Sequence, residues 1–189
     1  MGTRNLTVVI KDNQVKLSQY GQWDGYFRVT GKKFINFVKN TDLNDFSKKI
    51  DLLKGCDSAY ITNTEKNFLE MQKNKEFFMP FIVAFPQFSR DTGVEILDII
   101  NRLDYQYCCD KKSFLVYIDS DSGWCEFIYI LDLDAETVYL LTNHDFTGAK
   151  ETPDFIKEKY KGFDCWYTSK VEDLPSSEEI QKISDELEL

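Results

Sequence analysis

Hydrophobic and polar residues alternate along the start of the chain, which predicts a two-stranded hairpin within residues 1–26. The apolar members of the two runs are Leu6, Val8 and Ile10, followed by Val15 and Leu17. Asp12-Asn13 between the runs is a small pair of the kind that tight two-residue turns require. This turn predicts a register with Ile10 opposite Val15, Val8 opposite Leu17, Leu6 opposite Gln19 and Arg4 opposite Gly21.

The pattern then changes to the period of amphipathic helices, which we expect over residues 30–40, 42–53, 62–71, 91–103, 153–160 and 177–187. Thr41 or Asp42 is suited to cap the second of these helices, and Gly55 to end it. Capping boxes are predicted at residues 62–65, 92–95 and 176–179, where a Ser or Thr precedes a Glu by three positions.

Further strands are expected where the period returns to two, over residues 114–118, 124–133 and 137–142. We interpret these as an antiparallel meander, residues 81–85 between two prolines as a brief buried strand, and residues 161–175 as a loop. Strands and helices therefore occur in blocks. This order predicts one α+β domain over residues 1–189, with a mostly antiparallel sheet and helices packed on one side of it.

Composition narrows the class of protein. A hydrophobic content of 42% and an aromatic content of 15% indicate a packed globule, and the formal net charge of −9 argues against binding to a nucleic-acid backbone. The five cysteines are an odd number without metal-site spacing, and the N-terminus has no apolar run. We therefore expect a cytoplasmic protein with reduced thiols, and no membrane segment because the longest apolar stretch is too short.

The candidate binding site is a corner beside the hairpin end. Its residues are Arg4, Asn5, Gln22, Trp23, Asp24, Arg90 and Asp91. The predicted register places Arg4 next to the loop between Gly21 and Gly25, and Asp91 would start a helix with free backbone N–H groups. A guanidinium directed at a core must be paired, so Asp24 or Asp91 is its expected partner. Trp23 would either stack on a planar ligand or form a lid on the core.

Other groups favour structural interpretations. Acidic residues gather at Asp119, Asp121, Glu126, Asp132 and Asp134, yet Ile130 occupies the position where a calcium loop needs Glu, so we expect solvated turns and no metal. The only histidine, His144, precedes Asp145, but neighbours at a strand end point apart. The chain has no phosphate-binding glycine motif, and removal of Met1 would expose Gly2, which carries no nucleophile. We expect no cofactor and assign no catalytic residue.

The strings Gly2-Thr3-Arg4-Asn5-Leu6-Thr7 and Gln19-Tyr20-Gly21-Gln22-Trp23-Asp24-Gly25-Tyr26 resemble the start of a family of small uncharacterised bacterial and phage proteins. Similar strings occur at residues 89–93, 124–126 and 132–134. The chain departs from that family at residues 27–31, where members commonly have a P-S-G-Q-G run. The resemblance implies a bacterial or phage origin and carries no known activity.

These features together predict a non-enzymatic, acidic, cytosolic binding protein. It would act as a phage or mobile-element accessory or counter-defence factor that docks on a host protein. The alternative is a small-molecule or nucleotide binder, or a hydrolase, that uses the corner at Arg4, Trp23 and Asp24.

Overall fold

The computed structural model describes residues 2–73, 79–89, 91–103, 114–117 and 123–187. Its centre is a five-stranded sheet in the order β2-β1-β5-β6-β7. These strands are β1 (Asn5–Lys11), β2 (Gln14–Gly21), β5 (Phe127–Asp132), β6 (Thr137–Thr142) and β7 (Asp164–Lys170). The β1–β5 pair is parallel and the other three pairs are antiparallel, so the predicted α+β fold with a mostly antiparallel sheet is confirmed.

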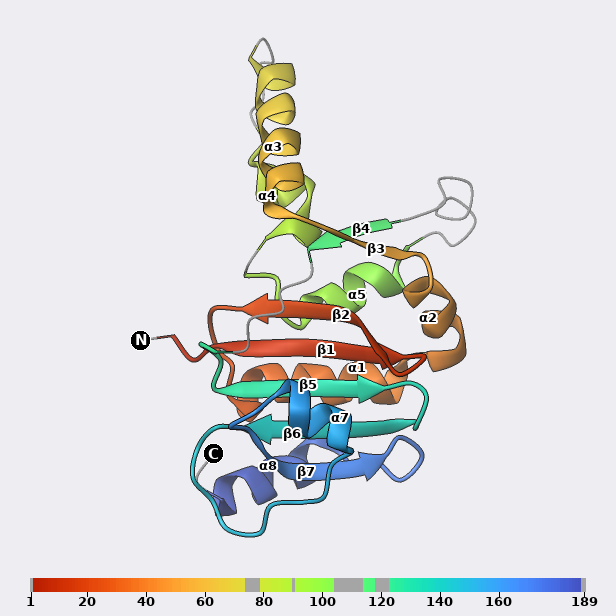
Figure 1. Ribbon diagram of the computed structural model, residues 1–189, viewed down its shortest axis with the longest axis vertical. Coiled ribbons are helices and arrows are strands. Elements are labelled where there is room, and N and C mark those ends of the chain that lie inside the picture. The colour runs from red at the N-terminus through yellow and green to blue at the C-terminus, as the bar shows by residue number, and fades with distance from the viewer. Residues whose placement is uncertain (1, 74–78, 90, 104–113, 118–122, 188–189) are drawn as a thin grey trace.

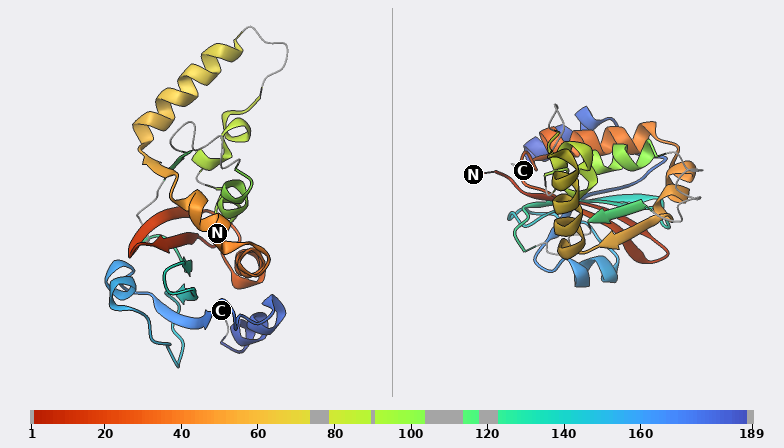
Figure 2. Two further views of the ribbon diagram at one scale, coloured as in Figure 1. Left: turned by 90° about the vertical axis from the view of Figure 1, so that its right-hand side faces the viewer. Right: turned by 90° about the horizontal axis from the view of Figure 1, so that it is seen from above.

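Helices cover both faces of this sheet. Figure 2 shows α1 and α8 on one face and α7 on the other. The first face is covered by η1 (Phe27–Gly31), α1 (Lys32–Asn40), α2 (Leu43–Ile50), α5 (Glu95–Asn101) and α8 (Ser177–Glu186), and the second by α7 (Asp154–Lys159). The expectation of helices on one side only is therefore wrong, because the strands carry apolar residues on both faces.

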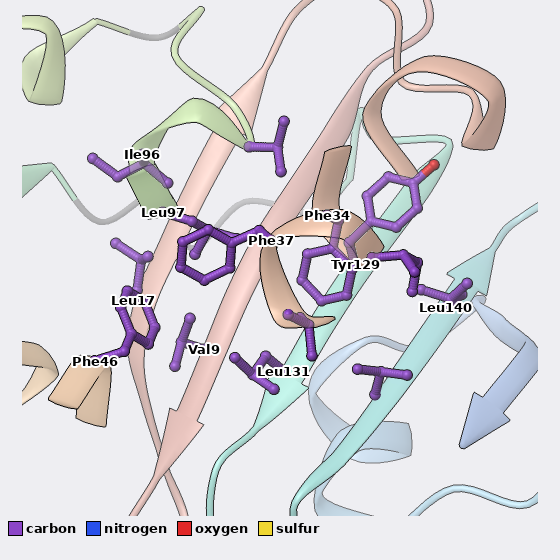
Figure 3. Packing of buried hydrophobic residues seen from close by; sticks show 14 of the residues in the cluster. Val9, Leu17, Phe34, Phe37, Phe46, Ile96, Leu97, Tyr129, Leu131 and Leu140 are labelled. Atoms are coloured by element: carbon purple, nitrogen blue, oxygen red, sulfur yellow. The ribbon is translucent and has the colours of Figure 1, made fainter. Parts of the chain in front are cut away.

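The larger core lies between the sheet and α1, α2, α5 and α8. Figure 3 shows side chains of α1, α2 and α5 packed on the strands. Phe34 and Phe37 of α1 contact Tyr129 of β5 and Phe46 of α2, with ring centroids 5.8 and 5.0 Å apart. The smaller core contains Leu6, Val8 and Ile10 with residues of α7. Residues of β1 are thus buried whichever face they point to.

A β-bulge in the hairpin changes the predicted register. Asp12 and Asn13 form the turn, both with positive φ, and Ile10 lies opposite Val15 as expected. The next pair is Val9 with Leu17, because Lys16 is an extra residue in β2. Leu17 therefore joins the larger core beside Val9, on the face opposite to the one predicted.

An arm extends from the sheet and contains the remaining described elements (Figure 1). We use "the arm" for β3 (Leu53–Cys56), α3 (Ser58–Gln72), α4 (Phe81–Ala84), η2 (Pro86–Phe88) and β4 (Phe114–Tyr117). Strands β3 and β4 form a separate parallel pair, so the predicted meander of residues 114–142 is wrong in its first strand. The meander that forms is β5–β6–β7, and β7 lies where a loop was expected.

Several predicted element boundaries are also corrected. Residues 81–84 are helical because Phe81, Phe85 and Phe88 pack on one another and on Phe68, and this packing overrides their strand propensity. Helix α3 begins after Asp57, whose side chain accepts a hydrogen bond from the Tyr60 amide, and not at residue 62. Gly55 lies in β3 and does not end a helix.

Two further helix starts test the predicted capping boxes. The box at residues 92–95 does not form, since α5 starts at Glu95 and Thr92 donates its hydroxyl to the carbonyl of Pro86. The box formed by Ser176 and Glu179 is confirmed.

Candidate functional site

The corner forms at one end of the sheet, where β1 and β5 begin and β2 and β6 end (Figure 1). The bulge moves its register by one residue, so Asn5 and not Arg4 lies opposite Gly21. The structure brings Arg4, Asn5, Gln22, Trp23 and Asp24 to this end. Arg90 lies outside the described residues.

The corner loop, residues 21–26, is held in place by hydrogen bonds to its backbone. The Gly25 amide donates to the Thr3 carbonyl at 3.0 Å, and the Tyr129 hydroxyl donates to the Gly25 carbonyl at 2.6 Å. The Thr30 hydroxyl donates to the carbonyl of Asp24, a residue with a φ of 54°. A Cβ at position 25 would lie 2.9 Å from the Thr3 oxygen, so glycine permits this approach of the two backbones.

Asn5 supports the loop from beneath. Its side chain is 1% exposed, and its Nδ2 donates to the carbonyls of Gly21 and Trp23 at 3.3 and 3.5 Å. Gln22 is also engaged within the protein, because its Oε1 accepts a 2.8 Å hydrogen bond from the hydroxyl of the buried Tyr20. Asn5 Nδ2 and Gln22 Oε1 are thus engaged within the protein, where they help to hold the loop.

Trp23 is presented to solvent by this rigid loop. Its side chain is 61% exposed and lies against Gly2, where a Cβ would come within 2.3 Å of the indole. The interpretation of Trp23 as a lid on the core is therefore wrong. Asp24 next to it is also exposed.

Arg4 does not form the predicted ion pair with Asp24 or Asp91 within the described part of the chain. Its guanidinium lies over the ring of Trp124, 5.8 Å from the centroid, and donates to the Trp124 carbonyl at 3.4 Å. The charge stays partly exposed to water, so it requires no buried carboxylate. Trp124 is itself 68% exposed.

Trp124 was missed by sequence reasoning because it was placed inside a strand, whereas β5 begins three residues later. The corner thus presents two exposed indoles beside the first residues of the chain, one against Gly2 and one beneath Arg4. Among the residues that the structure describes, the other exposed large hydrophobic side chains lie on α8, at Ile183, on the arm, at Tyr60, Leu69, Met71, Ile82 and Val83, and just before α4, at Met79.

Glu126 and His144 form a second missed contact at the corner. His144 Nε2 lies 3.6 Å from Glu126 Oε2, while Glu126 Oε1 accepts a long hydrogen bond of 3.4 Å from the Arg4 amide. Phe127 pairs with Thr142, and this pairing brings the side chains of Glu126 and His144 together. The register of the predicted β5–β6 hairpin could therefore have indicated this contact. The ring of His144 also lies 5.3 Å from that of Phe127.

Asp91 lies near the corner but not at a helix start, since α5 begins four residues later. The segment is attached to β2 through Gln19 Nε2, which donates to the Ser89 carbonyl at 2.9 Å, and through the Gly93 amide, which donates to the Tyr20 carbonyl at 3.0 Å. The predicted set of free helix N–H groups at Asp91 is therefore wrong.

The acidic residues around the β5–β6 turn have structural roles. Asp134 accepts hydrogen bonds from the amides of Asp12 and Asn13, and Asp132 accepts from the amides of Asp134 and Ala135. Asp119 and Asp121 lie outside the described residues. Within the described ranges, no three His, Cys, Asp or Glu side chains are grouped closely enough to hold a metal ion.

Comparisons of the chain with models of known protein families, with curated proteins and with solved structures find no match. Among the helices that the structure describes, none combines the length and apolar character needed to cross a membrane.

Proposed function

We propose that this protein is a non-enzymatic binding protein that docks on a second protein through the corner. The observation that carries the proposal is that the corner has two exposed indoles, Trp23 and Trp124, with the Arg4 guanidinium lying over the ring of Trp124. Tryptophan and arginine are the residue types that most often dominate protein–protein binding energy. Large exposed indoles also leave much apolar surface in water, which a partner would cover.

The rigidity of the corner loop supports docking. Hydrogen bonds from Asn5, Gly25, Thr30 and Tyr129 fix the loop backbone, so Trp23 is already held where a partner would meet it. A preformed anchor loses less conformational entropy on binding, which favours affinity. The resemblance to bacterial and phage proteins supports a cytosolic accessory or counter-defence factor whose partner is a host protein.

The proposal is tested by affinity capture from bacterial lysate, followed by binding measurements on the purified pair. Three single variants are compared with the unaltered chain: Trp23→Ala, Trp124→Ala and Tyr60→Ala. Tyr60 is the matched control because it is an exposed aromatic residue on the arm, 45% accessible. We expect each tryptophan variant to weaken binding about 30-fold or more, as loss of a hot spot of about 2 kcal/mol does.

Tyr60→Ala should leave the affinity within about two-fold. Binding that survives both tryptophan substitutions would overturn the assignment of the corner. The alternative function, a small-molecule or nucleotide binder or hydrolase, would be favoured if no partner is captured and a nucleotide panel raises the melting temperature in a Trp23-dependent way.

A further inference from the structure

A cavity of about 490 Å³ lies at the end of the sheet opposite the corner. Its walls come from the end of α1, the first turns of α2, the β5–β6 turn and the segment between β7 and α8. Cavities of this volume are of the size that binds small organic molecules. The cavity shares no lining residue with the corner, so what it binds is independent of the proposed docking function.

Five apolar side chains form the floor of the cavity. Val38 and Leu174 are 1% and 5% exposed, and both belong to the larger core. Leu43, Leu133 and Val171 are partly exposed and pack against the same core. An apolar ligand body would cover Leu43, Leu133 and Val171, which water now reaches.

Polar groups with unused hydrogen-bonding capacity line one side. The side chains of Thr41, Asn44 and Ser47 line the cavity from α2 and the residues before it, and they form no hydrogen bond with any described residue. A few polar groups around an apolar floor are typical of small-molecule sites, where they orient the ligand.

The rim carries two carboxylates, Glu136 and Glu172, that have no ion pair within the part of the chain that the structure describes. Among the described residues of the lining, Lys39 is the one cation, and its ammonium donates to the Leu174 carbonyl at 2.8 Å. Its charge also contributes to lowering the pKa of Glu179, after the larger effect of hydrogen bonds to Ser176. The lining therefore has an excess of negative charge.

The turns that carry the two glutamates are fixed to each other. The Val171 amide donates to the Glu136 carbonyl at 2.9 Å, and the Lys170 ammonium donates to the Ala135 carbonyl at 2.5 Å. Glu172 directly follows Val171, so both carboxylates belong to one rigid part of the rim. A cation bound at this rim would therefore not have to order either turn first.

We propose that this cavity binds a small organic cation, with its apolar body on the floor and its protonated amine at Glu136 and Glu172. The amine would pair with carboxylates that have no ion pair within the described residues, and its N–H groups would engage Thr41, Asn44 or Ser47. The class is an aryl- or alkylamine.

The test uses tryptamine as the probe, with tryptophol as its neutral analogue and indole-3-acetate as its anionic analogue. Binding is measured by titration calorimetry, and the site is located by amide chemical-shift changes. We expect tryptamine to shift residues that line the cavity and to bind at least three-fold more tightly than tryptophol, while indole-3-acetate binds weakest.

Charge variants then separate this site from general attraction to an acidic protein. Glu136→Gln and Glu172→Gln should each weaken tryptamine binding about two- to five-fold, the range for a partly exposed ion pair, and leave tryptophol unchanged. The matched control is Glu158→Gln, an exposed glutamate of α7 on the other face of the sheet, which should have no effect.

Filling the cavity with Ser47→Phe should abolish binding of both tryptamine and tryptophol. If this variant fails to fold, the glutamate variants decide alone. The proposal is overturned if tryptophol binds as tightly as tryptamine. It is also overturned if a variant carrying both Glu136→Gln and Glu172→Gln keeps the affinity for tryptamine, or if the residues whose amide shifts change on binding lie outside the cavity.

Discussion

The hydroxyl of Tyr129 donates a 2.6 Å hydrogen bond to the carbonyl oxygen of Gly25. Tyr129 is a fully buried residue of β5, whereas Gly25 belongs to the corner loop that presents Trp23. Burial raises the pKa of Tyr129 well above its usual range, so the hydroxyl keeps the proton that it donates. This bond connects the centre of the core to the candidate site.

Replacing Tyr129 with Phe should loosen the corner loop. The Gly25 carbonyl would lose its side-chain donor, which costs about 1–3 kcal/mol when the group stays buried. We expect lower stability in urea and faster hydrogen exchange at the Gly25 amide. Tyr60→Phe is the control, since Tyr60 is exposed on the arm, and it should change stability by less than about 0.5 kcal/mol. Unchanged exchange at Gly25 would contradict the role of this bond.

Asn13→Gly should stabilise the hairpin. Asn13 has a φ of 55°, a conformation that glycine adopts without the steric cost borne by a residue with a Cβ. We expect a gain of up to about 1 kcal/mol in the free energy of unfolding, measured in urea. The same substitution at Asn63, in the middle of α3, should instead cost about 0.5 kcal/mol because glycine weakens helices. A loss of stability at both positions would refute the turn geometry.

Ser176→Ala should lower the melting temperature by about 2–4 °C at neutral pH, because it removes a helix cap. Hydrogen bonds from Ser176 lower the pKa of Glu179, so their contribution is present above the unfolded pKa of about 4.3 and is lost as pH falls through the folded value. The difference in melting temperature between the wild type and Ser176→Ala should therefore become smaller in acid. Thermal melts at pH values from 7 to 3 measure it. Ser169→Ala, in β7, should show no such narrowing.

The buried thiols should resist alkylation in the native protein. Burial raises the pKa of Cys165 to about 12, so the reactive thiolate is suppressed on the order of 10³-fold relative to an ordinary cysteine. Iodoacetamide at pH 7.5, read out by peptide mass spectrometry, should leave Cys165 and the equally buried Cys125 unlabelled until denaturant is added. Cys56 is only partly buried and should react sooner, although burial raises its pKa too. Native labelling of Cys165 as fast as Cys56 would contradict this order.

The geometry of the corner was predicted less well than the fold, because a shift of one residue in the β1–β2 register changes which residue lies opposite Gly21. Sequence reasoning placed Arg4 opposite Gly21, and the bulge at Lys16 places Asn5 there instead. Asn5 and Gln22 each form a hydrogen bond within the protein that supports the loop, and their expected contact with a ligand stays a prediction. The assignment of Trp23 to the site stays a prediction, and only the fold shows that its indole is exposed and that Trp124 is exposed at the same end of the sheet.

Features that depend on neighbours along the chain could be determined from the sequence alone. The turn at Asp12-Asn13, the capping box at Ser176 and the strands β5 and β6 are of this kind, because their energetics involve residues a few positions apart. The parallel pairing of β1 with β5 and the second buried face of the sheet were decided only by tertiary structure. These depend on contacts between segments more than 100 residues apart, whose apolar patterns fit more than one arrangement until the whole chain packs.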